Sequence, residues 1–219
     1  FSCAIFDKEG FLLSNAPHIP VHLGSMEDSV QSIIKMFQFD MRDGDVFLQN
    51  DPYNGGTHLP DLTVITPLFL DKDDVPSFYM ASRGHHADIG GITPGSMPSS
   101  STHINQEGVL IKGMKIISQG AFLEKDLYQN FVEDFKFPVR DFSLNLADIK
   151  AKIAANQVGI KKIKEVVQKH GKSFVLQYSD FIKRNASNIV IDLIKTLRPG
   201  QFSCPMDNGS KITVTITPN

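Results

Sequence analysis

The sequence has few cysteines, no long apolar run and almost no net charge, and each of these absences excludes a class of protein. The two cysteines, Cys3 and Cys204, lie far apart and form no Cys-x-x-Cys pair. We expect both to be small buried hydrophobes in a reducing compartment, with a disulfide between them as the alternative. No apolar run approaches the roughly 18 residues of a membrane helix. A net charge of −2 offers no basic surface for nucleic acid. A cytoplasmic protein without membrane or nucleic-acid partners is therefore expected.

Motifs for two common kinds of chemistry are also missing. The sequence has no Gly-x-x-x-x-Gly-Lys-Ser/Thr phosphate loop, and the pair Gly90 and Gly91 is too weak a signal to replace one. It has no Gly-x-Ser-x-Gly elbow, so the serines at residues 99–101 are predicted to lie in a flexible loop rather than to include a nucleophile. Neither nucleotide binding by this chain nor serine hydrolase chemistry is expected.

The start of the sequence indicates a piece of a longer protein. It begins at Phe1, inside a strand-like run, and shows no basic segment followed by an apolar one. We therefore expect no signal peptide and an excised fragment.

The composition is that of a globular protein, and the strand-like and helix-like patterns occupy different parts of the sequence. Hydrophobic residues make up 41% and charged residues 21%, which are ordinary values. Short apolar runs bounded by turn residues predict strands at residues 2–7, 11–14, 46–49, 62–70 and 76–82. Helical spacing predicts a helix capped by Ser25 and two long helices at residues 145–170 and 173–197, while residues 211–217 alternate as a strand does.

This pattern predicts an α+β fold. We expect a β-rich domain that carries the site over residues 1–118, a helical segment over residues 119–200, and the start of a further β region at residues 201–219.

Acid and imidazole groups gather in two segments, residues 50–61 and 82–91, each bracketed by glycine and proline. His58 and Asp61 lie three residues apart in a predicted turn, where both side chains can converge on one point. An imidazole nitrogen and a carboxylate oxygen suit Zn, Mn or Fe. The alternative is that Asp61 caps a turn and His58 is an ordinary loop histidine.

The second segment contains the adjacent histidines His85 and His86. On an extended backbone their side chains point to opposite faces, so only one of them is expected to join His58 and Asp61. The other histidine and Asp88 are then candidates for acid/base catalysis or for orienting a ligand.

Three further residues have candidate roles. Arg83 can bind a substrate carboxylate, or it can pair with Asp51 or Asp61 as part of the scaffold. His22, expected just before a helix, can line the site or make a structural hydrogen bond. Glu107 follows a loop, where a carboxylate can activate water or simply be solvated.

The same segments resemble the hydantoinase B/oxoprolinase family, which includes hydantoinase B subunits, the C-terminal half of 5-oxoprolinase and the large subunits of acetone-type carboxylases. The resemblance runs over nearly the whole chain, although family members are normally much longer. The segments that carry it are residues 1–7, 19–26, 50–61, 85–91 and 105–108.

The resemblance implies a metal site. The matching subunit of acetone-type carboxylases holds manganese, which favours His85 as the third ligand beside His58 and Asp61. His86 and Asp88 would then be the catalytic pair, and Arg83 and His22 the substrate-binding residues.

The resemblance also implies an activity, namely ATP-assisted opening of a cyclic amide such as 5-oxoproline or a hydantoin. A hydantoinase A-like subunit or domain would handle the ATP, in an oligomer. Carboxylation of a ketone is one alternative, and a non-catalytic module that forms a subunit interface is another.

Overall fold

The computed structural model describes residues 1–16, 18–71 and 73–218. The chain divides into two compact units, Phe1–Val175 and Leu176–Asn219, and each is described here by itself.

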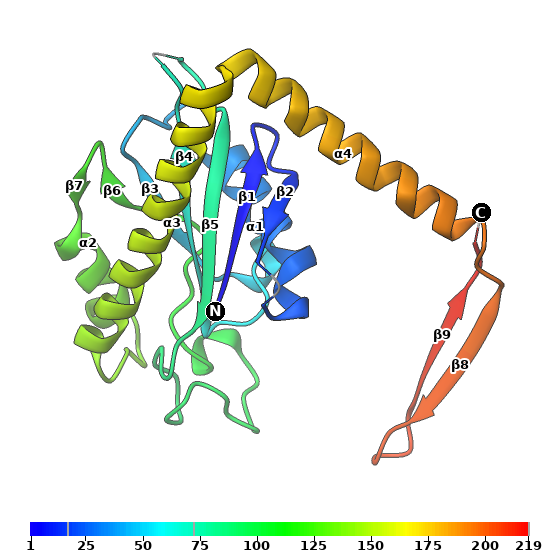
Figure 1. Ribbon diagram of the computed structural model, residues 1–219. Helices are drawn as coiled ribbons and strands as arrows, with labels where there is room; N and C mark the ends of the chain where they lie inside the picture. Colours follow the sequence, from blue (N-terminus) through cyan, green and yellow to red (C-terminus); the bar gives the residue numbers. More distant parts are fainter. Residues whose placement is uncertain (17, 72, 219) are drawn as a thin grey trace. The chain divides into compact units, whose positions relative to one another are not determined.

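The first unit is built on a seven-stranded antiparallel sheet in the order β2-β1-β5-β4-β3-β6-β7 (Figure 1). The long strands β4 and β5 lie next to each other near its centre and pair along their whole length. The strands are β1 (Ser2–Asp7), β2 (Leu12–Asn15), β3 (Val46–Gln49), β4 (Asp61–Leu68), β5 (Phe78–His85), β6 (Met114–Ser118) and β7 (Ala121–Phe122).

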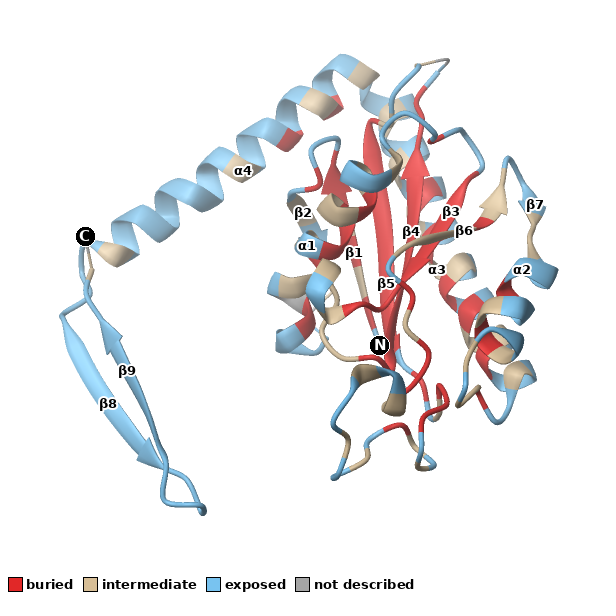
Figure 2. Cartoon of the chain, turned by 180° about the vertical axis from the view of Figure 1, so that it is seen from behind, coloured by how far each residue is buried: buried red, intermediate tan, exposed pale blue. Residues whose placement is uncertain are grey.

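Helices cover both faces of this sheet, as the two opposite views show (Figures 1 and 2). On one face, Met26, Val30 and Ile33 of α1 (Pro20–Phe37) are buried against strand residues that include Phe6 and Phe47. On the other face lie α2 (Glu124–Tyr128), the π-helical segment η3 (Gln129–Glu133) and the long α3 (Phe142–His170). Because helices cover both faces of the sheet, its central strands are buried and apolar on both sides.

Alternation along β4 decides which residues face which helix. Leu62 and Val64 belong to the core on the α3 side, whereas Ile65 belongs to the core on the α1 side. Asp61 and Thr63 share the face of Ile65, so the first residue of β4 presents its carboxylate on the α1 side.

The same alternation runs along β5. Arg83 contacts α1, while Ser82 contacts Asn156 of α3. His85 shares the face of Arg83 and pairs directly with Asp61 across the two strands. The fold therefore places a carboxylate and an imidazole side by side at one end of the central strand pair.

The predicted α+β class is confirmed, but the start of the first helix is not where the sequence suggested. α1 begins at Pro20 rather than after Ser25, because proline is well suited to the first helical position, where no hydrogen-bonded N–H is needed. Ser25 lies inside the helix, and its hydroxyl donates to the carbonyl of Val21. His22 is consequently in the first turn of the helix instead of before it.

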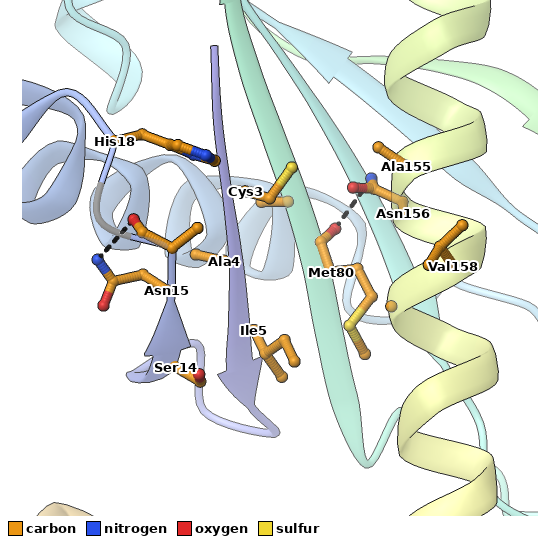
Figure 3. Close-up of a pocket in the computed structure, with 13 residues that line it drawn as sticks. Cys3, Ala4, Ile5, Ser14, Asn15, His18, Met80, Ala155, Asn156 and Val158 are labelled. Carbon is orange, nitrogen blue, oxygen red and sulfur yellow. Dashed lines mark hydrogen bonds between the residues drawn. The ribbon is translucent and has the colours of Figure 1, made fainter.

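A cavity of about 470 Å³ opens between β1, β2 and α3 (Figure 3). Its walls are largely apolar and include Cys3, Ile5, Met80 and Val158. None of the candidate site residues named from the sequence lines it, so the cavity is separate from the acid and imidazole groups.

The second unit consists of the end of α4 (Lys172–Ile194) and the hairpin of β8 (Gly200–Pro205) and β9 (Lys211–Ile216). Its register pairs Phe202 with Val214 and Cys204 with Ile212, so the apolar side chains share one face of the hairpin. Cys3 and Cys204 are both free, as expected, but Cys3 is only half-buried and Cys204 is exposed. The prediction that it is buried was wrong, because nothing in the described unit covers this two-stranded ribbon.

No helix of the described residues combines the length and apolar character needed to cross a membrane.

Candidate metal centre

Three side chains that the sequence singled out converge at the end of the β4–β5 pair. Nδ1 of His58 lies 2.9 Å from Oδ2 of Asp61, and Nδ1 of His85 lies 3.3 Å from Oδ1 of the same carboxylate. One ligand atom from each of the three residues lies within 4.8 Å of the others. Asp61 is buried, but the side chains of His58 and His85 are 43% and 48% exposed, so the cluster opens to solvent.

Glycines allow the first loop to pack closely on its neighbours. Gly55 has a φ of +87°, and a Cβ there would lie 2.4 Å from the carbonyl oxygen of Asp28 in α1. A Cβ on Gly56 would lie 2.6 Å from the carbonyl oxygen of Asn50. Only glycine fits either position, which explains the Gly-Gly pair just before His58.

Asn50 ties the first loop to a segment far along the chain. Its side-chain amide donates to the carbonyls of Leu59 and Val109, at 2.9 and 2.8 Å, and its side-chain oxygen accepts from the N–H of Ile111 at 2.7 Å. Asn50 is fully buried, so these bonds satisfy groups that water cannot reach. They fix the backbone next to His58.

The carboxylate of Asp61 is held from several sides. Thr57 donates to Oδ2 at 3.0 Å, and Nε2 of His22 lies 3.2 Å from the same oxygen. Burial by itself would raise the pKa of Asp61, but His58, the Thr57 hydrogen bond, His22 and His85 together outweigh it and leave the pKa below its ordinary value. Asp61 is therefore a carboxylate, ready to bind a cation.

His22 supports that carboxylate and does not reach solvent. It is buried, and its second ring nitrogen lies 2.9 Å from the hydroxyl of Ser2. Burial lowers its pKa, against the opposing effect of Asp61. The assignment of His22 to substrate binding is corrected: the helix that begins at Pro20 turns its side chain inward, onto Asp61.

Arg83 is also part of the scaffold. It is completely buried, and its guanidinium donates to the hydroxyls of Thr63, Ser25 and Ser29. Burial lowers its pKa to about 10, which still leaves it charged at neutral pH. The assignment of Arg83 to substrate binding is corrected as well, because its hydrogen bonds clamp β5 to α1 and none of its surface is open to a substrate.

His86 lies on the opposite side of the sheet from His85, as an extended backbone requires. Its Nδ1 lies 2.6 Å from the side-chain oxygen of Asn145, and its Nε2 faces the ammonium nitrogen of Lys152. Burial, with the charge of Lys152, lowers the pKa of His86 to about 3, so the imidazole is neutral. His86 is packed against α3 and does not join the cluster, as expected for one of two adjacent histidines, and its assignment to catalysis stays a prediction.

Lys152 was missed in the sequence. Burial lowers its pKa to about 7. A signal was present: Asn145, Ile149, Lys152 and Asn156 are all buried and follow the spacing of one helix face. Three polar residues on the inward stripe of α3 point to a polar network beneath the sheet.

Asp88 caps the turn that follows the second site segment. Its carboxylate accepts from the N–H groups of Gly90 and Gly95 and pairs with Arg140 at 2.7 Å. Every one of these partners is structural, which favours a role for Asp88 in shaping the loop, and its assignment to catalysis stays a prediction.

We expect Asp88→Asn to lower the stability of the chain by about 1–2 kcal/mol and to leave its metal content unchanged. The amide nitrogen would face the N–H of Gly95 and the guanidinium of Arg140, two donors without an acceptor. Thermal melting and elemental analysis of the same preparation measure both quantities. An unchanged melting temperature with a loss of turnover would return Asp88 to the mechanism.

The donor set fits a divalent transition metal. Ligand atoms bonded to one ion at about 2.1 Å lie roughly 3.0–3.4 Å apart for bond angles between octahedral and tetrahedral. The two separations from Asp61 are close to that range, with 2.9 Å from His58 to Oδ2 and 3.3 Å from His85 to Oδ1. Two imidazoles and one carboxylate leave coordination positions open on the exposed side.

Comparison with known proteins identifies the family of this chain and its fold. The model of the Hydantoinase B/oxoprolinase family matches residues 1–219. The chain is 42% identical to the 5-oxoprolinase of Saccharomyces cerevisiae over its whole length, which is 18% of that protein. The ATP-dependent caprolactamase of Pseudomonas jessenii has the same fold, with a TM-score of 0.87 and 24% identity over 99% of this chain and 38% of the other. Acetone carboxylase also shares the fold, with a TM-score of 0.79 and 20% identity over 92% of this chain and 26% of the other.

The chain therefore belongs to the Hydantoinase B/oxoprolinase family. It spans less than a fifth of the length of the 5-oxoprolinases that it matches.

Proposed function

We propose that this chain is the metal-holding part of an ATP-dependent hydrolase of cyclic amides, of the 5-oxoprolinase type. The observation that carries the proposal is the convergence of His58, Asp61 and His85 on one point, at the open end of the β4–β5 pair. The 5-oxoprolinase relatives, at 41–43% identity over 90% or more of the chain, support cyclic amides as the substrate class.

In this proposal His58, Asp61 and His85 hold a divalent ion, with Mn, Zn and Fe as the candidates. Such an ion would polarise an amide carbonyl or lower the pKa of a bound water. The chain's own residues keep the donor set in place: Thr57 and His22 orient the carboxylate, and Asn50 fixes the backbone beside His58. The exposed imidazoles leave room for a small substrate.

In this proposal ATP binds to another subunit or domain. Ring amides resist hydrolysis, and the sequence has no phosphate loop. We therefore assign ATP to a hydantoinase A-like subunit or domain, which would activate the carbonyl that this part of the protein then hydrolyses.

The hydrolase is favoured over its two alternatives. The likeness to acetone carboxylase, at 20% identity, concerns the fold, whereas the 5-oxoprolinase relatives are about twice as similar in sequence. A non-catalytic interface module would not require a buried carboxylate shared by three imidazoles.

The experiment compares His58→Ala with His170→Ala in the longest natural polypeptide that carries this chain, purified with its ATP-handling partner. His170 is exposed at the end of α3 and serves as the matched control. Elemental analysis should find about one equivalent of metal in the wild type and in the control, and a large loss in His58→Ala. ATP-dependent hydrolysis of 5-oxoproline and of a hydantoin should fall in parallel. A wild type without bound metal would refute the proposal.

A further inference from the structure

A small hollow adjoins the candidate metal centre. It has a volume of about 190 Å³ and is lined by His58 and Pro60 from the first loop, by Met97 and Pro98 from the segment after the second, and by Glu107. At about 30 Å³ per water molecule in the liquid, it holds about six waters, the space of a five- or six-membered ring. Two prolines and a methionine make much of its wall apolar.

The backbone on either side of Glu107 is fixed against the second site segment. The N–H of Ile92 donates to the carbonyl of Gln106 at 2.8 Å, and the N–H of Val109 donates to the carbonyl of Ile89 at 2.9 Å. Gly91, with a φ of +88°, permits this approach, because a Cβ there would lie 2.8 Å from the carbonyl oxygens of Gln106 and Glu107.

The two carboxylate oxygens of Glu107 differ in their hydrogen bonding. The hydroxyl of Ser101 donates to Oε1 at 2.7 Å, which orients the carboxylate. Among the residues that the structure describes, no hydrogen bond or salt bridge uses Oε2. A carboxylate accepts hydrogen bonds and donates none, so Glu107 offers an acceptor at the wall of the hollow, beside apolar side chains.

A cyclic amide carries features that match these walls. Its ring carbons are apolar, and its C=O and N–H groups are adjacent and held on the same side by the ring. In 5-oxoproline the carbon next to the N–H also bears a carboxylate, which has to point out of the hollow and away from Glu107. A carbonyl directed to the metal centre leaves the N–H to be satisfied by a nearby acceptor, since an unpaired polar group in a small site is costly.

We propose that this hollow receives the ring of the substrate and that Glu107 determines specificity by accepting a hydrogen bond from the ring N–H. The inference rests on the proposed function, because it takes the substrate to be a cyclic amide. It adds a residue and a subsite to the metal cluster, and it separates recognition of the ring nitrogen from attack at the carbonyl.

The test measures the binding of two ligands to the wild type and to one variant. Glu107→Gln keeps the size of the side chain, and Glu133→Gln, at an exposed glutamate of η3, is the matched control. The ligands are the five-membered lactam 5-oxoproline and its lactone analogue, in which a ring oxygen replaces the N–H. Both are measured on the longest natural polypeptide with its partner: KM and kcat for the lactam, and competitive inhibition by the lactone.

In the wild type the lactam should bind about 10- to 100-fold more tightly than the lactone, the range for a hydrogen bond to a charged acceptor. Glu107→Gln should raise KM for the lactam by a similar factor and leave lactone inhibition within about twofold. Metal content and melting temperature should match those of Glu133→Gln. A matched fold and metal content with a lost preference for the lactam would establish the subsite.

Two results would overturn the inference without touching the proposed function. The first is a wild type that contains metal, hydrolyses the lactam and does not prefer it to the lactone. The second is a Glu107→Gln variant with a lowered kcat but an unchanged lactam-to-lactone ratio, which would make Glu107 a group that moves a proton. A wild type without metal or lactam hydrolysis would instead refute the proposed function itself.

Discussion

Asp61→Asn is expected to lower the affinity of the protein for Mn²⁺ and Zn²⁺ by more than about 100-fold. Losing a residue that merely supports a metal ligand typically costs 10- to 100-fold, so losing the charged ligand costs more. Both carboxylate oxygens are in use, one facing His85 and the other facing His58, His22 and Thr57. An amide nitrogen in the Oδ1 position faces His85, and one in the Oδ2 position faces both His58 and His22, so at least one imidazole loses its acceptor.

Calorimetric titration with each metal measures this change. Asp126→Asn, at an exposed aspartate of α2, is the matched control and should bind as the wild type does. Circular dichroism should show that Asp61→Asn keeps its sheet, since the carboxylate lies at the end of β4 and not within its core. Equal affinities in Asp61→Asn and the control would remove the metal centre from the proposal.

The free energy of unfolding of the chain is expected to rise between pH 7 and pH 9 by about 1 kcal/mol per pH unit. Lys152 causes the rise, because burial lowers its pKa from 10.5 to about 7, against the opposing effects of Asp148 and Asp61. Between these two values the unfolded chain binds a proton that the folded chain does not, so stability increases with pH. His86, which faces the amine, is neutral throughout this range.

Lys152→Met should remove this slope, since it replaces the amine with an apolar side chain of similar length. Urea unfolding at pH 7, 8 and 9, followed by circular dichroism, measures it. Lys161→Met, at an exposed lysine of the same helix, should keep the slope of the wild type. Parallel pH profiles for the wild type and Lys152→Met would show that the buried amine is charged in both states.

The sequence predicted those parts of the fold that depend on local patterns. β1 and β3 match their predicted bounds because each is a short apolar run between turn residues. β5 extends to His85, beyond its predicted end, because the polar residues at its end gain a hydrogen-bonded partner strand that no local pattern reveals. The start of α1 was missed because a serine that resembles a cap follows the proline that begins the helix.

The candidate site divides in the same way. His58 and Asp61 could be predicted because glycine and proline mark their loop. Adjacent histidines on a strand must diverge, which left His85 and His86 as alternatives, and only the family resemblance favoured His85. For Arg83 and His22 the sequence left a structural role and substrate binding open and could not decide between them. Arg83 meets its hydroxyl partners on α1, more than 50 residues away, and His22 meets Asp61 39 residues away. Burial of a polar side chain depends on such distant partners, and the local sequence around the residue does not reveal them.

The hairpin of β8 and β9 has a consequence for handling this chain in the laboratory. Phe202 is 72% exposed and Val214 52%, and they lie together on a ribbon with two open edges. Adjacent apolar side chains and unpaired strand edges promote association between molecules. In concentrated solution the chain by itself is expected to bind hydrophobic dyes and to form aggregates through this ribbon. Light scattering at increasing ionic strength would then rise, even while the sheet that carries the metal centre stays folded.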